Sequence, residues 1–283
     1  MELHPRLVVT GGRGQLGRAL GARVPGAVLL DIDELDLTDG EAVVGMLCDL
    51  RPETIIHGGA YTAVDAAESD PEGARAVNAG GTRAVARAAA TLGARLVYIS
   101  TDYVFGGTPG EPYPEDHPTG PLSVYGATKL EGEQATAEVE QHLIVRTSWV
   151  FGEGKNFIGA ILGAARTRAE LSVVDDQWGR PTYATDLAGG ILELLDREAT
   201  GTFHLQGGGE PATWADVAEA ALAAAGSATR VARVTTAEYD SRQTGRTAPR
   251  PAFSVLDCSK AAGLGVALRP WREAVEEYVK VTA

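Results

Sequence analysis

The sequence predicts an α/β fold: a doubly wound parallel sheet of the Rossmann type, followed by a smaller C-terminal α/β domain. Two observations carry this prediction. Short apolar runs alternate with stretches of helical periodicity through the first half of the 283 residues, and a glycine-rich turn follows the first run. Apolar strands that alternate with helices are typical of a parallel sheet covered on both faces, and right-handed crossovers then give the doubly wound arrangement.

The first half is expected to contain five strands and four helices. Thr38 and Glu41 have the spacing of a capping box at the start of the second helix, and Pro52 follows its end. The expected strands are 6–10, 27–31, 54–60, 95–100 and 142–147, and the expected helices are 15–24, 39–50, 72–93 and 122–140.

The second half is less regular. The segment 226–251 is rich in Thr, Arg, Gly and Pro and is expected to form a long loop that carries Arg230, Arg233, Arg242, Arg246 and Arg250. Helices are expected near 156–168, 184–196 and 270–281 and after a cap at Thr213, with strands near 171–175 and 202–206.

The charge balance limits the classes of partner. With 25 Lys and Arg against 38 Asp and Glu, the net charge is −13, which disfavours nucleic acid and anionic membrane surfaces. An anionic ligand would therefore need a local Arg. The two cysteines, Cys48 and Cys258, allow neither a disulfide framework nor a zinc site, and His4, His117, His142 and His204 have no metal-ligand spacing. No signal peptide or membrane span is expected, so we expect a cytoplasmic protein. From the spacing of Cys and His we expect no metal site.

The glycine-rich turn TGGRGQLG at 10–17 predicts a dinucleotide site. Gly11 permits the sharp turn, Gly14 lets the backbone approach a pyrophosphate, and Gly17 lets the helix pack close to the sheet. Asp31 ends the second apolar run, where a carboxylate commonly meets the adenosine ribose. Arg13 either neutralises a 2′-phosphate or is a solvated side chain. We expect a dinucleotide-binding domain over 1–148, which also receives segments near 171–200, and a mainly substrate-binding domain over 149–283.

A Tyr–Lys pair predicts proton transfer. Tyr125 and Lys129 are four residues apart, so a helix places them on one face. A nearby ammonium favours the phenolate and lowers the pKa of the phenol, which suits Tyr125 to proton transfer. Ser100 or Thr101, at the end of the fourth strand, can hydrogen-bond a substrate oxygen beside the phenol.

Six motifs run through the chain: STDYVF (100–105), VYGATK (124–129), RTSWVFG (146–152), KNF (155–157), DQWGRPTY (176–183) and RP-x-x-S (250–254). In order and spacing they resemble the dTDP-4-dehydrorhamnose reductase family, within the extended short-chain dehydrogenase/reductase superfamily. The resemblance covers essentially the whole chain, and a run of six motifs is highly specific.

The resemblance implies NAD(P)H-dependent reduction of the C4 ketone of dTDP-4-dehydro-6-deoxy-L-mannose to dTDP-L-rhamnose. Tyr125 protonates the sugar oxygen, and Thr101 and Lys129 are the other catalytic residues. NADPH is the expected cofactor and NADH the alternative, because a carboxylate at Asp31 repels a 2′-phosphate. The expected cofactor-binding residues are Gly11, Arg13, Gly14, Gln15, Leu16, Gly17, Asp31, Asp36, Leu37, Ala60, Tyr61, Thr62, Tyr125 and Lys129. The expected substrate-binding residues are Thr101, Asp102, Trp149, Asn156 and Arg250.

Two departures from the family pattern stand out. HGGAYT at 57–62 has His57 and two glycines where the family usually shows Asn and alanines, and we interpret His57 as a packing residue at a strand end. Some members dimerise through a metal held partly by an acid on the first helix. The first helix here, GQLGRALGARV, has no acid, so we expect a monomer or a weak homodimer.

Three other functions remain as alternatives. A nucleotide-sugar dehydratase typically needs an Asp–Glu pair after the Thr, whereas this chain has Asp102 and Tyr103. A non-catalytic NADP-binding regulatory subunit, similar to the beta subunit of methionine adenosyltransferase, would not require the proton-transfer residues. A 4-ketoreductase for another dTDP-6-deoxysugar of a secondary-metabolite pathway would use the same residues.

Overall fold

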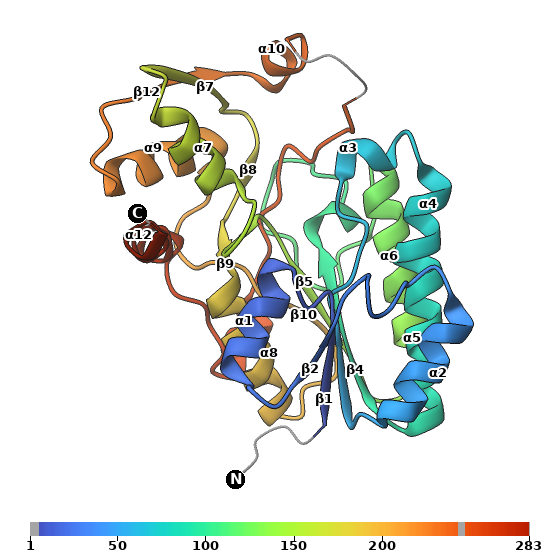
Figure 1. Ribbon diagram of the computed structural model, residues 1–283. Helices are drawn as coiled ribbons and strands as arrows, with labels where there is room; N and C mark the ends of the chain where they lie inside the picture. The colour runs from blue at the N-terminus through green and yellow to red at the C-terminus, as the bar shows by residue number, and fades with distance from the viewer. Residues whose placement is uncertain (1–5, 243–246, 283) are drawn as a thin grey trace.

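A six-stranded parallel sheet forms the centre of the computed structural model, which describes residues 6–242 and 247–282 (Figure 1). His4 and Arg246 lie outside the described residues. The strands, in their order across the sheet, are β10 (Gly201–His204), β5 (His142–Thr147), β4 (Arg95–Thr101), β3 (Thr54–His57), β1 (Leu7–Thr10) and β2 (Val28–Leu30). The predicted parallel, doubly wound sheet is confirmed.

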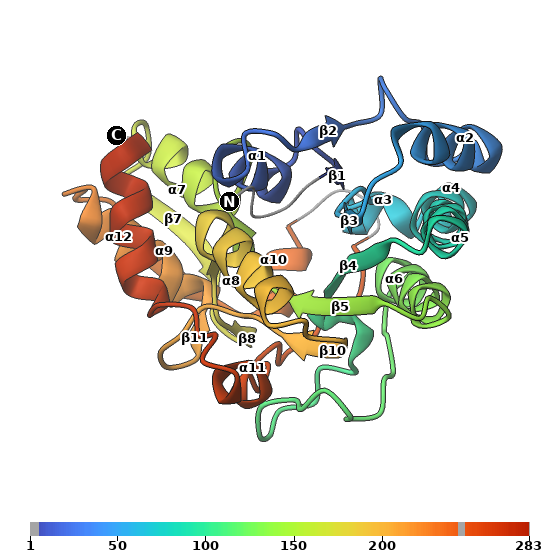
Figure 2. The ribbon, with the colours of Figure 1, turned by 90° about the horizontal axis from the view of Figure 1, so that it is seen from below.

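Helices cover both faces of this sheet (Figures 1 and 2). One face carries α1 (Gln15–Arg23) and α8 (Ala184–Asp196), and the other carries α2 (Gly40–Leu50), α5 (Thr82–Leu92) and α6 (Val124–Ala137). Alternate residues of β1 point to opposite faces: Leu7 and Val9 pack against the α8 side, and Val8 packs against the α2 and α5 side. Both faces are therefore buried, which explains the uninterrupted apolar strands.

Two details of the first half differ from the predictions. The N-cap of α2 is Asp39, whose carboxylate accepts the Ala42 N–H at 3.0 Å, and not Thr38, which instead hydrogen-bonds the Asp36 carboxylate. The helix expected over 72–93 is three segments: α4 (Pro71–Arg75), the π-helical turn η1 (Ala76–Gly81) and α5. The short elements α3 (Val64–Ala67) and η2 (Asp102–Val104) follow β3 and β4.

The described C-terminal part is built from pairs of short strands and five helices. The strand β7 (Glu170–Val174) pairs in parallel with β12 (Arg230–Val234), and the helices α7 (Phe157–Ala165), α9 (Trp214–Ala224) and α12 (Trp271–Thr282) pack beside them. The Thr213 cap predicted for α9 is confirmed as a capping box. The remaining elements are β6 (Val150–Phe151), β8 (Trp178–Gly179), β9 (Thr182–Tyr183), β11 (Ala212–Thr213), α10 (Thr236–Asp240) and α11 (Ser259–Gly263).

The long loop predicted over 226–251 is wrong in its first half. Residues 230–234 form β12, which pairs in parallel with β7 and leaves Val231, Ala232 and Val234 half-buried between its exposed arginines. Thr235 and Glu238 then form a capping box that starts α10. None of the helices within residues 6–242 and 247–282 combines the length and apolar composition that crossing a bilayer requires.

Candidate active site

A candidate ligand-binding crevice lies at the carboxyl ends of β1 and β3, where the order of the strands across the sheet reverses. Thr10 and His57 are neighbours at these ends, and Gly11 and Gly58 follow them. Gly11 has a φ of +72°, and a Cβ there would lie 2.8 Å from the Gly59 nitrogen. In open α/β sheets such a reversal is where ligands bind. The side-chain-free backbone leaves this crevice open.

The turn before α1 has the form that a pyrophosphate requires. A Cβ at Gly17 would clash with the carbonyl oxygen of Gly11, so only glycine lets α1 begin this close to the turn. Gly14 is the N-cap of α1 and has no side chain to fill the space before the helix. A helix N-terminus with its N–H groups exposed favours an anion.

A cavity of about 370 Å³ opens beside this turn. Of the residues expected to bind a cofactor, those that line the cavity are Gly11, Arg13, Gly14, Asp31, Asp36, Leu37, Ala60 and Thr62. Gln15, Leu16, Gly17 and Tyr61 lie outside this lining. The Gln15 amide nitrogen donates to the Lys155 carbonyl at 3.1 Å, and its buried oxygen has no hydrogen-bond partner in the described chain. A buried acceptor in this state suits a ligand donor.

The predicted catalytic residues converge at the ends of β4 and α6. Ser123 caps α6 by accepting the Gly126 N–H at 3.1 Å, which fixes the first turn that carries Tyr125. The Thr101 hydroxyl donates to the Asp102 carboxylate at 2.9 Å. The same hydroxyl also hydrogen-bonds the Tyr125 phenol, an interaction that by itself lowers the pKa of the phenol. Thr101, Asp102 and Tyr125 are therefore neighbours.

The pKa of Tyr125 differs from the prediction. We expected the ammonium of Lys129 to lower it, but burial of the phenol, together with the Asp102 charge, raises the pKa well above its ordinary value. Lys129 does not offset this, because its Nζ donates to the Ile99 carbonyl at 2.7 Å and burial lowers its own pKa to about 7. At neutral pH the Tyr125 phenol is protonated and able to donate a proton.

Asp102 is a buried carboxyl with one free oxygen. Burial raises its pKa to about 6. Oδ1 accepts the Thr101 hydroxyl, whereas Oδ2 has no partner within the described residues. An unpaired buried acceptor beside Tyr125 is a position for a hydroxyl group of a ligand.

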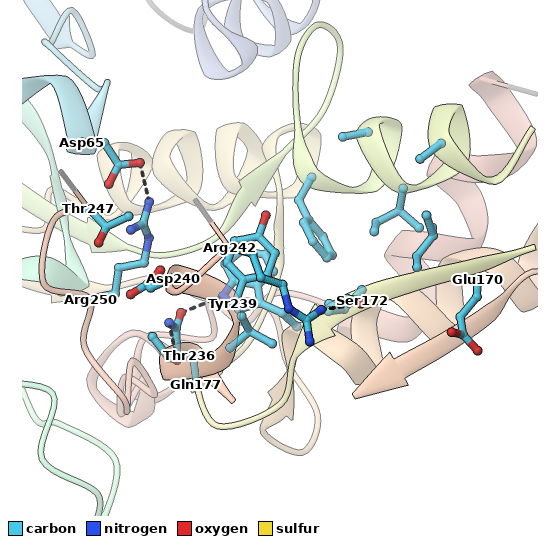
Figure 3. Close-up of a pocket in the computed structure, with 18 of the residues that line it drawn as sticks. Asp65, Glu170, Ser172, Gln177, Thr236, Tyr239, Asp240, Arg242, Thr247 and Arg250 are labelled. Atoms are coloured by element: carbon cyan, nitrogen blue, oxygen red, sulfur yellow. Dashed lines mark hydrogen bonds and ion pairs between the residues drawn. The ribbon is translucent and has the colours of Figure 1, made fainter. Parts of the chain in front are cut away.

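A larger cavity of about 810 Å³ lies in the C-terminal part, between α7, β7 and α10 (Figure 3). Phe157, Trp214 and Tyr239 give it aromatic walls, and Arg250 lies at one end. The Arg250 guanidinium contacts the Asp65 carboxylate of α3 at 2.8 Å. This ion pair connects the C-terminal part with the part of the chain that forms the six-stranded sheet. The size, the aromatic walls and the cation suit an aromatic base that carries a diphosphate.

Trp149 and Asn156 do not line this cavity. Trp149 has a φ of +48°, a strained conformation for a bulky residue, and its ring stacks on Trp214 at 3.7 Å between centroids. Asn156 caps α7: its oxygen accepts the Gly159 N–H at 2.9 Å and its nitrogen donates to the Tyr278 hydroxyl at 2.8 Å. Through these contacts both residues shape the cavity wall.

Two site residues were missed from the sequence. Asp65 holds Arg250 and also accepts the Ala248 N–H at 2.9 Å, but a lone acid on a four-residue helix has no sequence signal. Asn78 lies in the π-helical turn and connects the Tyr61 backbone with the Thr128 hydroxyl on α6. Only the NAGG sequence at 78–81, which weakens a regular helix, hints at this irregularity.

His57 packs at the end of β3, as we interpreted it. Its Nδ1 lies 2.6 Å from the Thr10 hydroxyl and its Nε2 lies 3.0 Å from the Thr82 hydroxyl. Because Thr82 donates its hydrogen to the Asn78 carbonyl, His57 is neutral with its proton on Nε2. Burial lowers its pKa to about 3. No group of three or more His, Cys, Asp or Glu side chains within the described ranges is arranged to hold a metal ion.

Comparison with known proteins extends the sequence resemblance to the full length. A family profile described as the RmlD substrate binding domain matches residues 5–283. A dTDP-4-dehydrorhamnose reductase of Streptomyces griseus is 42% identical over 288 residues, 97% of this chain and 93% of that protein. A dTDP-4-keto-6-deoxy-D-glucose reductase of Streptomyces niveus is 38% identical over 96% of each chain. The crystal structure of a dTDP-4-dehydrorhamnose reductase from Bacillus anthracis in complex with NADP is 37% identical, with a TM-score of 0.92 over 98% of this chain and 99% of that one.

Proposed function

Because this chain belongs to the dTDP-4-dehydrorhamnose reductase family, we propose that it reduces the C4 ketone of dTDP-4-dehydro-6-deoxy-L-mannose to give dTDP-L-rhamnose. The observation that carries this proposal is the convergence of Thr101, Asp102 and Tyr125 at the sheet edge that also carries the glycine-rich turn. A bound reduced nicotinamide dinucleotide supplies the hydride for C4.

The cofactor in this proposal is NADPH, with NADH as the alternative. The cradle formed by Gly11, Gly14 and Gly17 fits a pyrophosphate, and the unpaired Gln15 oxygen fits a ligand that brings a hydrogen-bond donor. The cavity beside the turn, with Asp31 and Asp36 on its wall, would take the adenosine end. Lys129 would leave the Ile99 carbonyl to hold ribose hydroxyls on the nicotinamide side.

Tyr125 is the proton donor. As hydride arrives at C4, negative charge develops on the ketone oxygen, and the phenol transfers its proton to that oxygen. The raised pKa keeps the phenol protonated until then. The Thr101 hydroxyl donates a hydrogen bond to the Asp102 carboxylate and so holds it in place beside Tyr125. The other Asp102 oxygen is available to a sugar hydroxyl.

The nucleotide part of the substrate would occupy the larger cavity. Of the three arginines in its described lining, we assign Arg250 to the diphosphate, since a guanidinium binds phosphate oxygens through two parallel N–H groups; the diphosphate would take over N–H groups that now contact Asp65. Trp149 and Asn156 support the wall on this side. The proposed division is a dinucleotide-binding domain over 1–148, which also receives segments near 171–200, and a mainly substrate-binding domain over 149–283. Packing of α8 on the central sheet supports it, whereas β7, in the same stretch, pairs with β12 instead.

A second candidate is the 4-ketoreductase step for a different dTDP-6-deoxysugar. The likeness to the dTDP-4-keto-6-deoxy-D-glucose reductase of Streptomyces niveus supports it. The same catalytic residues serve both, because the orientation of the sugar above the nicotinamide decides the configuration at C4. For the chain itself we infer a cytoplasmic monomer or weak homodimer that binds neither nucleic acid nor membranes, in keeping with its net charge of −13.

The test is incubation with dTDP-4-dehydro-6-deoxy-L-mannose and NADPH or NADH. We expect loss of absorbance from the reduced cofactor and dTDP-L-rhamnose by NMR. A product with the other C4 configuration would support the second candidate. Loss of a sugar hydroxyl, or no turnover together with copurification of a synthetase, would contradict both in favour of a dehydratase or a regulatory subunit.

A further inference from the structure

Four charged side chains surround the mouth of the smaller cavity. Arg13 lies in the glycine-rich turn, and Asp31, Asp33 and Glu34 lie in the turn that follows β2. Arg13 and Asp31 line the cavity itself. This cluster is the group that an adenosine ribose would meet first, if the cavity takes the adenosine end of a dinucleotide as proposed above.

The guanidinium of Arg13 is engaged by all three of these acids, and its Nε lies 4.0 Å from the Asp31 carboxylate. Its Nη1 lies 2.6 Å from the Asp33 carboxylate and its Nη2 lies 3.2 Å from the Glu34 carboxylate. Glu34 is fixed in turn, because it also accepts the Asp31 N–H at 3.0 Å. The positive charge that a 2′-phosphate would need is therefore already paired with carboxylates.

Asp31 is fixed with its carboxylate at the ribose position. One oxygen accepts the Arg13 N–H at 2.7 Å, and the other accepts the Ile32 N–H at 2.9 Å. A carboxylate accepts hydrogen bonds from ribose hydroxyls, but it repels a phosphate.

The charge sum of the cluster is −2, with three carboxylates and one guanidinium. A 2′-phosphate brings about −1.5 to −2 more at pH 7. NADH presents a neutral 2′-hydroxyl at the same place. The cluster therefore favours the cofactor without the phosphate, on a chain that already carries −13.

We propose that Asp33 and Glu34 determine cofactor choice: by pairing with Arg13 they neutralise the charge that would attract a 2′-phosphate, so that this chain accepts NADH at least as readily as NADPH. This inference rests on the proposed function only for the identity of the cavity as the adenosine site. Asp33 and Glu34 act through Arg13 and are specificity-determining residues, not catalytic ones.

The test measures binding of two fragments, ADP-ribose and 2′-phospho-ADP-ribose, by calorimetry without any sugar substrate. We expect the unmodified protein to bind the phosphorylated fragment no more tightly than ADP-ribose. In the Asp33→Asn/Glu34→Gln variant, affinity for the phosphorylated fragment should rise by roughly 10-fold, because Arg13 is released for a charge-assisted hydrogen bond. Adding Arg13→Gln should abolish that gain. The matched control is Glu41→Gln, an exposed acid of α2 paired with Arg87.

Salt gives an independent readout. Repulsion between exposed like charges is screened by salt, so the affinity of the unmodified protein for the phosphorylated fragment, relative to ADP-ribose, should increase between low and physiological ionic strength. In the double variant the same ratio should decrease.

Three results would overturn the inference. The first is tighter binding of the phosphorylated fragment than of ADP-ribose by the unmodified protein. The second is weaker binding of that fragment in the double variant, which would mean that the acids orient Arg13 toward the phosphate. In both cases ADP-ribose binding would leave the proposed function intact. The third, no binding of either fragment, would overturn the cofactor site and this inference together.

Discussion

The two cavities of this protein are built from different parts of the chain. The smaller cavity includes four glycines, Gly11, Gly14, Gly58 and Gly59, in its wall, whereas the described lining of the larger one has none. In the larger cavity, the surface includes aromatic rings from α7, α9 and α10 and the side chains of Arg168, Arg242 and Arg250. Main-chain groups bind the pyrophosphate of a dinucleotide, which many enzymes share, whereas side chains bind the substrate, which differs from one enzyme to the next.

This difference predicts that substitutions separate the two binding events. Changes at the glycine cradle should affect the cofactor alone, and changes at Arg250 should affect the nucleotide sugar alone. Tyr125, which lines neither cavity, should affect turnover without affecting either affinity.

Tyr125→Phe should have the largest effect. It removes only the hydroxyl that donates the proton, so turnover should fall by about 10² to 10⁴. Binding of NADPH and of dTDP should be unchanged, as measured by calorimetry. The exposed Tyr239→Phe is a control for loss of a phenol from the cavity wall. Turnover within twofold of the unmodified protein would contradict the role of Tyr125.

Asp102→Asn should stabilise the protein above pH 6. The folded-state pKa of about 6 lies above the ordinary 3.8, so the folded protein loses stability as the pH rises from about 4 to about 6. Removing the charge should raise the free energy of unfolding at pH 8 by up to about 3 kcal/mol. Denaturant unfolding at pH 4 and pH 8 measures this gain, which should vanish at pH 4. The exposed Asp49→Asn serves as the control, and a less stable variant at pH 8 would refute this account of Asp102.

Arg250→Gln should weaken dTDP binding by about 10-fold to 100-fold, the value of charged hydrogen bonds to a phosphate. Cofactor affinity should not change. Arg230→Gln removes the same charge from an exposed position outside the cavity and should be neutral. Equal losses in both variants would show that only net charge matters.

Gly17→Ala should have a smaller effect, limited to the cofactor. The added Cβ pushes α1 away from the Gly11 carbonyl, and such overpacking costs about 1 to 3 kcal/mol. Affinity for ADP-ribose should fall accordingly, while dTDP affinity stays the same. Gly45→Ala on α2 is the control, because nothing lies within 4 Å of its new methyl group. Unchanged affinity for ADP-ribose would contradict the assignment of the glycine-rich turn as the cofactor-binding site.

The sequence predicted the sheet domain more fully than the C-terminal part. Uninterrupted apolar runs, as at Leu7, Val8 and Val9, follow from burial on both faces of the sheet and can be recognised in the sequence. The strand β12 was missed because its two exposed arginines, Arg230 and Arg233, are typical of a solvated loop, and only the pairing with β7 makes the segment a strand.

The site was predictable where spacing alone decides geometry. The Tyr125–Lys129 pair needs only a helix, and Gly11, Gly14 and Gly17 need only a strand followed by a helix. Contacts between distant segments were not predictable: the Asp65–Arg250 pair joins residues 185 positions apart. The pKa of Tyr125 was also missed, because burial and the Asp102 charge depend on the tertiary structure.

Transfer of deuterium tests the central claim most directly. The protein is incubated with NADPH deuterated at nicotinamide C4, on the transferred face, and with dTDP-4-dehydro-6-deoxy-L-mannose, and the product is examined by NMR and mass spectrometry. We predict one deuterium at sugar C4, with the C4 hydroxyl proton exchanging freely with water. Absence of deuterium from C4 in a reaction that consumes the sugar would contradict the account.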